Sequence, residues 1–207
     1  MWPWGHLAVG YVLYSLGVRA RTGEAPDGWN VVALAVGTQF PDLIDKPLAW
    51  WLGVLPGGRT LAHSLLVAVP LVLVLGVLAR RYDAGPRATA FAVGYLSHLA
   101  GDALVPALVG SPRELAFLLW PATPMVVYEN PPLVADLALT RAAVADLVAA
   151  VLAPGGFAAV LAVVTSPVVL TELAVIAALG ALWLADGLPP LPELAARRRG
   201  PADRNAR

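Results

Sequence analysis

The chain contains three histidines, His6, His63 and His98, and the last of them stands four residues before Asp102. A helix through residues 97–102 would place His98 and Asp102 on one face, one turn apart. An imidazole and a carboxylate at this spacing can share a metal ion, or the aspartate can orient the histidine. The alternative interpretation is a structural pair, in which Asp102 satisfies a histidine that faces another helix.

A second acidic motif follows a proline. Asp42 and Asp45 are three residues apart after Pro41, so one helical turn would point both carboxylates the same way. Two neighbouring carboxylates repel unless a cation lies between them or one is protonated. The pair therefore indicates a cation site, and the alternative is an interfacial turn with two solvated acids.

The third motif pairs a cation with a histidine. Arg59 and His63 are four residues apart at the start of an apolar run, and Ser64 follows. An arginine at this place suits a phosphate or a carboxylate, because its planar fork binds oxyanions through two hydrogen bonds. The alternative is an interfacial arginine beside a lone histidine. His6 follows two tryptophans, which are common anchors at a membrane surface.

The composition indicates a membrane protein. Hydrophobic residues make up 58% of the chain and charged residues 14%, with a mean hydropathy of +0.71, whereas a soluble domain has about 25% charged residues. Membrane lipids are therefore the expected partners. A formal net charge of zero gives no reason to expect nucleic acid. The absence of cysteine excludes thiolate zinc sites and cysteine nucleophiles.

The apolar segments predict an all-α fold: a polytopic bundle of about five to seven helices. The clearest membrane span is 61–79, whose 19 residues would measure about 28 Å as a helix. Further helices are expected at 6–18, 29–40, 88–109, 142–153 and 157–185. A proline-rich loop with a short helix in it is expected within 111–132. Residues 1–190 are predicted to form one membrane domain, with the site motifs in 1–125, and residues 191–207 a basic, disordered cytoplasmic tail.

The arginines predict the orientation. Three groups follow the first helix, separate the third from the fourth and follow the last; they are Arg19 and Arg21, then Arg80, Arg81 and Arg87, then Arg197, Arg198 and Arg199. The positive-inside rule places all three groups in the cytoplasm. Alternating helices then bring the unusual polar residues to the opposite, non-cytoplasmic end. The prediction is a multi-pass protein of the inner (cytoplasmic) membrane with a cytoplasmic C-terminus.

The gathering of histidines and aspartates at one end of the bundle predicts a metal site. The candidate ligands are His6, Asp42, Asp45, His63, His98 and Asp102. Imidazole and carboxylate suit Zn²⁺, with Mn²⁺ or Fe²⁺ as alternatives, and six such groups are enough for one or two ions. Two ions would activate a water molecule and hold the oxygens of a phosphoester. Asp45, Arg59 and Asp102 are the candidate catalytic residues, with Arg59 holding the phosphate.

At these residues the sequence resembles the YdjM-type family of membrane-bound metal-dependent hydrolases, a domain of unknown function. The matching elements are His6, the segment 41–45, Arg59-Thr60 with His63-Ser64, Ser97-His98 with Asp102, and Leu119-Trp120-Pro121. The resemblance covers about residues 1–125. One departure is the absence of a glycine directly after Arg59, which puts the role of this arginine in question. The resemblance implies a metal-dependent hydrolase.

A more distant resemblance is to the all-helical fold of zinc-dependent phospholipase C and P1 nuclease. It implies that His63, His98, Asp102 and one of the two neighbouring aspartates bind one ion, and that His6 and a bridging Asp102 bind another. It also implies a phosphoester substrate, small or lipidic. Glu129 is a candidate for the acid that assists the leaving group.

Two other functions are compatible with the same residues. A cation or proton transporter could use His98, Asp102 and Glu172, the last of which lies in the final apolar segment. A non-catalytic membrane protein stabilised by metal would use the same ligands as the hydrolase. The sequence does not indicate an oligomeric state.

Overall fold

A computed structural model describes residues 3–108, 110–124 and 167–198, together with short stretches between 145 and 165. Every element in the described residues is a helix, as predicted. The chain divides into two compact units, Met1–Val127 with Leu182–Arg207, and Tyr128–Ala181. The single membrane domain of 1–190 stays a prediction. Glu129 and the tail from residue 199 lie outside the described residues, as does the side chain of Glu172.

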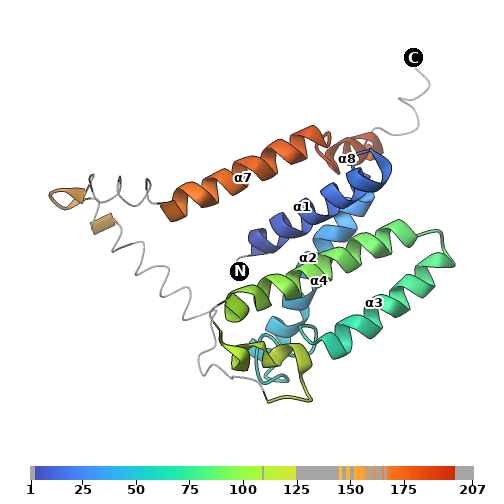
Figure 1. Ribbon diagram of the computed structural model, residues 1–207, viewed down its shortest axis with the longest axis horizontal. Coiled ribbons are helices and arrows are strands. Elements are labelled where there is room, and N and C mark those ends of the chain that lie inside the picture. Colours follow the sequence, from blue (N-terminus) through green and yellow to red (C-terminus); the bar gives the residue numbers. More distant parts are fainter. Residues whose placement is uncertain are drawn as a thin grey trace. The chain divides into compact units, whose positions relative to one another are not determined.

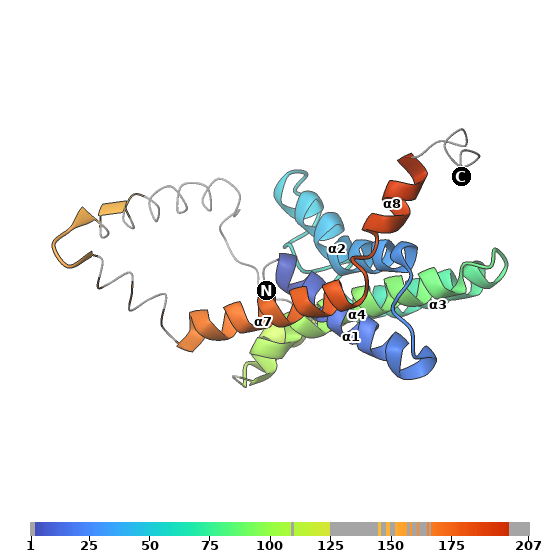
Figure 2. The same cartoon turned by 90° about the horizontal axis from the view of Figure 1, so that it is seen from above.

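The first unit is built around one central helix. The helices that pack together in it are α1 (Pro3–Thr22), α2 (Gly28–Trp50), α3 (Leu65–Arg80), α4 (Gly85–Leu108) and the 3₁₀ helix η1 (Pro112–Leu119). Helix α4 contacts all of the others, with α1 and α3 on its two sides (Figure 1). Helix α2 lies against both α1 and α4 (Figure 2). In the second unit, the residues of α7 (Pro167–Ala185) up to Ala181 are helical.

Two glycines let α2 and α4 touch backbone to backbone. A Cβ atom added to Gly37 would lie 2.3 Å from the carbonyl oxygen of Phe91, and one added to Gly94 would lie 2.4 Å from that of Leu34. Small residues at helix contacts are the usual device in membrane proteins, where packing drives association. The contact sets Thr38 of α2 beside α4, and this position matters for the site.

Helix α2 is longer than predicted. It continues through Pro41 and Pro47 to Trp50, although an end near Phe40 was expected. A proline inside a helix removes only one backbone hydrogen bond and adds local strain. Here Asp45, in the part beyond Pro41, is fully buried and binds the following loop. This tertiary anchoring keeps the second half of α2 helical.

Helix α3 begins later than predicted, at Leu65 instead of residue 61. Ser64 caps it, because the Ser64 hydroxyl accepts a hydrogen bond from the N–H of Leu66 at 3.1 Å. The backbone N–H groups of Thr60, Ala62 and His63 donate to Asp45. His63 therefore lies in the turn before the helix.

The helix best suited to cross a membrane is α4, and not the predicted segment 61–79. Among the described residues, α4 is the one helix that is both long and apolar enough to cross a membrane. Helix α3 has 16 residues, about 24 Å, and counts as a shorter apolar helix. The prediction of 61–79 as the clearest span was wrong, because four of its residues belong to the loop.

The C-terminal part of the first unit is tied to α1. The buried Asp186 carboxylate accepts hydrogen bonds from the hydroxyls of Tyr11 and Ser15, each at 2.6 Å, and from Arg19 Nε at 2.7 Å. Burial alone would raise the pKa of Asp186, but these hydrogen bonds and the Arg19 charge outweigh it and hold the pKa below its usual value. The end of α7 therefore lies level with the C-terminal half of α1.

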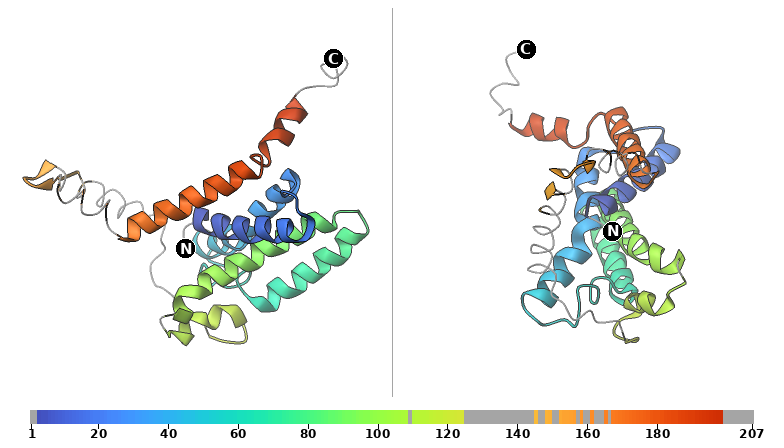
Figure 3. Two further views of the ribbon diagram at one scale, coloured as in Figure 1. Left: turned by 45° about the horizontal axis from the view of Figure 1, so that its top comes forward. Right: turned by 90° about the vertical axis from the view of Figure 1, so that its left-hand side faces the viewer.

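A second tie involves α8 (Leu191–Arg198). Glu193 accepts a hydrogen bond from the N–H of Gly28, the first residue of α2, at 3.0 Å. A carboxylate at a helix N-terminus is favourable because it meets unpaired N–H groups and the positive end of the helix dipole. Residues 191–198 thus form a helix (Figure 3) that contacts the start of α2 through Glu193, where a disordered tail was expected.

The glycine contact predicts a specific difference between two equivalent substitutions. Gly37→Ala should destabilise the protein by about 1–3 kcal/mol, because the new methyl group overlaps the Phe91 carbonyl oxygen. Gly76→Ala in α3 meets nothing within 4 Å and should be neutral or stabilising, since alanine favours helix by about 1 kcal/mol. Thermal unfolding in detergent, followed by circular dichroism, measures both. Equal melting temperatures for the two variants would contradict the close α2–α4 contact.

Candidate metal centre

The structure brings all six predicted ligands together within the first unit. His6, Asp45, His63, His98 and Asp102 are buried, with exposed fractions of 5% or less, and the side chain of Asp42 is 13% exposed. His6 comes from α1, the two neighbouring aspartates from α2, His63 from the turn before α3, and His98 and Asp102 from α4. Buried ionisable groups are costly unless they are paired or bind a cation.

Asp45 organises the turn that carries His63. Its carboxylate accepts backbone hydrogen bonds from Thr60 at 2.7 Å, Ala62 at 2.8 Å and His63 at 3.2 Å. The same carboxylate lies 2.8 Å from His63 Nδ1. Because a carboxylate can only accept, this Nδ1 carries the proton and His63 Nε2 is left as a lone pair. Asp45 therefore fixes both the position of His63 and its tautomer.

His98 is oriented in the same way by a backbone carbonyl. Its Nδ1 lies 2.7 Å from the carbonyl oxygen of Thr38, which can only accept, so Nδ1–H donates and Nε2 is again a lone pair. The Nε2 atoms of His63 and His98 face each other at 3.2 Å. Two lone pairs at this distance repel unless a proton or a metal ion lies between them.

Two carboxylates complete this group. Asp42 Oδ1 lies 3.6 Å from His63 Nε2 and 3.8 Å from His98 Nε2. Asp102 Oδ2 lies 3.6 Å and 3.9 Å from the same two nitrogens. Ligands of a tetrahedral zinc ion with bonds of about 2.0–2.1 Å are about 3.3 Å apart. Asp42, His63 and His98 therefore have the donor chemistry of a zinc site and form one group that can hold a metal ion.

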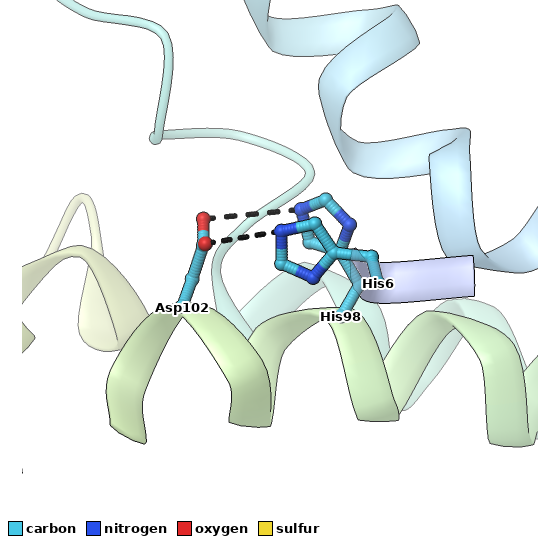
Figure 4. A group of neighbouring side chains, drawn as sticks. All are labelled: His6, His98 and Asp102. Carbon is cyan, nitrogen blue, oxygen red and sulfur yellow. Dashed lines mark ion pairs between the residues drawn. The ribbon is translucent and has the colours of Figure 1, made fainter. Parts of the chain in front are cut away.

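His6 lies on the other side of Asp102. Its Nε2 is 3.2 Å from Asp102 Oδ1, and its ring stacks on that of His98 with centroids 3.7 Å apart. Figure 4 shows His98 and Asp102 rising from the same side of α4, with the His6 ring beside that of His98. His6 Nδ1 is buried and has no hydrogen-bond partner in the described part of the chain. His6, His98 and Asp102 form a second group that can hold a cation.

The predicted arginine also reaches the site. Arg59 Nε lies 2.9 Å from Asp102 Oδ2, and 44% of the Arg59 side chain is exposed. Arg59 thus pairs with a candidate ligand.

Several positioning residues escaped the sequence analysis. Thr38 orients His98 through its backbone carbonyl. Because every residue has such a carbonyl, the sequence does not single this one out. Lys46, the only lysine, was given no functional role, yet its Nζ lies 2.6 Å from Asp42 Oδ2. The spacing of four residues between an aspartate and a lysine on a helix was a usable signal. The Ser64 hydroxyl donates to the Trp120 carbonyl at 2.6 Å, which holds the segment 119–121 against the start of α3.

The carboxylates also set the protonation of His63. Burial alone lowers the pKa of His63, but hydrogen bonds and charge from Asp42 and Asp45 outweigh it and raise the pKa above its usual value. In the metal-free protein the group therefore attracts a proton. The same negative surroundings would attract a divalent cation.

The fold and the site define a class: an all-helical protein with a buried cluster of histidines and aspartates that can hold a metal ion. The sequence matches the YdjM inner membrane protein family over residues 1–185. The chain therefore belongs to the YdjM inner membrane protein family, which confirms the predicted resemblance and the membrane location. Comparison with curated proteins and with solved structures gives no match. The distant resemblance to phospholipase C and P1 nuclease stays a prediction.

The different surroundings of the two α2 aspartates predict different effects of the same substitution. Asp45→Asn should destabilise the 51–63 turn by about 1–3 kcal/mol, since the asparagine amide turns a donor toward backbone donors. Trypsin should then cleave faster after Arg59, a half-exposed residue of this turn. Asp42→Asn is the matched control, because Asp42 pairs with the side chains of Lys46 and His63. Equal cleavage rates in the two variants would contradict the anchoring role of Asp45.

Proposed function

We propose that this chain is a membrane-bound metal-dependent hydrolase of phosphoesters. The observation that carries the proposal is the convergence of two imidazole nitrogens, His63 Nε2 and His98 Nε2, which lie 3.2 Å apart, with Asp42 Oδ1 and Asp102 Oδ2, each of which lies 3.6–3.9 Å from both nitrogens. Each of the two imidazoles has its Nδ1 proton bound elsewhere, so the group offers lone pairs. Nitrogen and oxygen donors of this kind suit Zn²⁺, and also Mn²⁺ or Fe²⁺.

In this proposal Asp45 is an orienting residue. Its carboxylate already accepts three backbone N–H groups and the Nδ1–H of His63, which favours a supporting role over direct coordination. Such carboxylate–histidine pairs raise the basicity of the ligating nitrogen and hold its ring in place. Asp42 is the member of the acidic pair that faces the two Nε2 atoms.

The number of ions separates a catalytic site from a structural one. Four protein ligands close a zinc site, and closed sites are typically structural, whereas catalytic sites keep an open position. A second ion held by His6 and a bridging Asp102 would provide open positions. The buried, unpartnered Nδ1 of His6 and its stacking on His98 support this second position. When bound, such ions supply Lewis acidity and lower the pKa of a water molecule toward about 7.

The protein groups then have separate tasks. Asp42 and Asp102 compensate the ionic charge, Asp45 and the Thr38 carbonyl hold the imidazoles, and the exposed part of Arg59 is free to turn toward a phosphoryl oxygen. The substrate class, a small or lipid phosphoester, follows from the donor chemistry of Arg59 and from the membrane location.

We further propose a multi-pass arrangement with the site at the non-cytoplasmic end. The C-terminal end of α1 and the turn between α3 and α4 lie at one end of the bundle, away from the start of α1 and the end of α4 (Figure 1). The arginines of that turn and Arg19 belong to the first end. The tie between Arg19 and Asp186 sets the end of α7 there as well, which supports a cytoplasmic C-terminus.

Metal analysis of the detergent-purified full chain tests the proposal. The wild type should retain two equivalents of zinc after gel filtration, and Asp102→Ala should lose both, because Asp102 is common to the two positions. His63→Ala should lose the ion between the two Nε2 atoms, and His6→Ala only the second. Binding should weaken as the pH falls through the pKa of His63, which lies above its usual value, since this imidazole must lose a proton to bind a metal.

The outcomes are distinct. A wild type without stoichiometric transition metal contradicts the hydrolase. One tightly bound zinc that His6→Ala does not change, together with no turnover of phosphodiester or phospholipid substrates, favours the non-catalytic metal-stabilised protein. Selective uptake of cations into vesicles would favour a transporter instead.

A further inference from the structure

The only lysine in the chain stands on the outer side of a candidate metal ligand. Lys46 Nζ lies 2.6 Å from Asp42 Oδ2, while the other oxygen, Oδ1, faces the His63 and His98 nitrogens. The Asp42 side chain is 13% exposed and the Lys46 side chain 34% exposed. The carboxylate therefore lies between the buried nitrogens and a cation that reaches solvent.

Arg59 pairs with the second carboxylate, on the same oxygen that lies 3.6 Å and 3.9 Å from the Nε2 atoms of His63 and His98. Its Nε lies 2.9 Å from Asp102 Oδ2, with 44% of the arginine side chain exposed against 3% for the aspartate. Both proposed carboxylate ligands thus have a partly exposed cation on them. The two cations come from different elements, Lys46 from α2 and Arg59 from the turn before α3.

One indole links these two elements. Lys46 Nζ lies 5.7 Å from the centre of the Trp50 ring, within the range of a cation–π contact. The backbone of Gly58 packs against the same ring, since an added Cβ atom there would lie 2.9 Å from Trp50 Cζ2. Arg59 is the next residue. Trp50 therefore contacts both the lysine and the backbone directly before the arginine.

The charge balance indicates what these cations are for. Three carboxylates and two cations, with neutral imidazoles, give the metal-free site a formal charge of −1. One divalent ion would change it to +1 and two ions to +3. If the cations served only to neutralise the carboxylates, the bound metal would make them redundant and costly. A metal-loaded site with a net positive charge at its exposed rim attracts an anion.

We propose that Lys46 and Arg59 form an anion-binding pair that holds a phosphoryl group against the metal-loaded site. The inference rests on the proposed function and adds Lys46 to it as a second cation for the phosphoryl group. A phosphoryl group offers several oxygens, so it can contact a metal ion, the Arg59 fork and the Lys46 ammonium together. A free phosphate ester and a phospholipid headgroup share this chemistry.

Phosphate binding to the zinc-loaded full chain in detergent, measured by isothermal titration calorimetry, tests the pair. Lys46→Met should weaken the binding of inorganic phosphate about tenfold or more, the effect of losing one charged hydrogen bond. Lys46→Arg should retain most of the affinity. Zinc content should not fall in Lys46→Met, because the substitution removes a cation that competes for Asp42. Arg81→Met, at the far end of α3, is the matched control for the loss of one positive charge.

Two failures are distinguishable. A wild-type chain that takes up no zinc overturns the proposed function. A zinc-loaded wild type that does not bind phosphate, or that binds it no more tightly than Lys46→Met, overturns this inference alone. An equal loss in Arg81→Met also overturns it, since the effect would then come from the overall charge of the protein.

In phosphatidylcholine vesicles, competition by added phosphatidic acid assigns the phosphoryl group to a lipid, and no competition assigns it to a soluble ester.

Discussion

Two imidazole nitrogens, His63 Nε2 and His98 Nε2, face each other at 3.2 Å inside this protein, and both are lone pairs when the two rings are neutral. The Nδ1–H of His63 donates a hydrogen bond to Asp45, and the Nδ1–H of His98 donates one to the Thr38 carbonyl oxygen. Neither ring can turn to relieve the repulsion without losing a buried hydrogen bond, which would cost about 1–3 kcal/mol. The arrangement is stable only with a cation or a shared proton between the rings, and the rest of the site follows from this need.

The architecture of the first unit meets this constraint from several directions. The backbone contact at Gly37 and Gly94 brings the Thr38 carbonyl of α2 within hydrogen-bond distance of His98. Asp45 draws the turn before α3 around itself, which sets His63 opposite His98. The tie between Arg19 and Asp186 lies at the other end of α1. The candidate metal ligands at one end and the arginines Arg19, Arg80 and Arg81 at the other therefore share the same four helices.

The sequence predicts the helical fold, and the six residues that it singles out lie close together in the structure. Their roles are harder to predict. The spacing of His98 and Asp102 places both on one face of α4, as expected. The spacing of Asp42 and Asp45 predicts a common direction, but it cannot say which carboxylate meets a loop and which meets the histidines, because this depends on tertiary contacts. Pro41 suggested a helix end for the same reason: the burial of Asp45, which keeps the helix intact beyond it, is invisible in the local sequence.

The most direct test of the central claim is zinc K-edge X-ray absorption on the full chain loaded with one equivalent of zinc. The account predicts a four-coordinate ion with two imidazole nitrogens and two carboxylate oxygens at about 2.0–2.1 Å. The outer-shell scattering should fit two imidazoles in the wild type and one in His98→Ala. An ion surrounded by oxygen alone, or a spectrum that His98→Ala leaves unchanged, would contradict the claim that His63 and His98 present their Nε2 atoms to one metal.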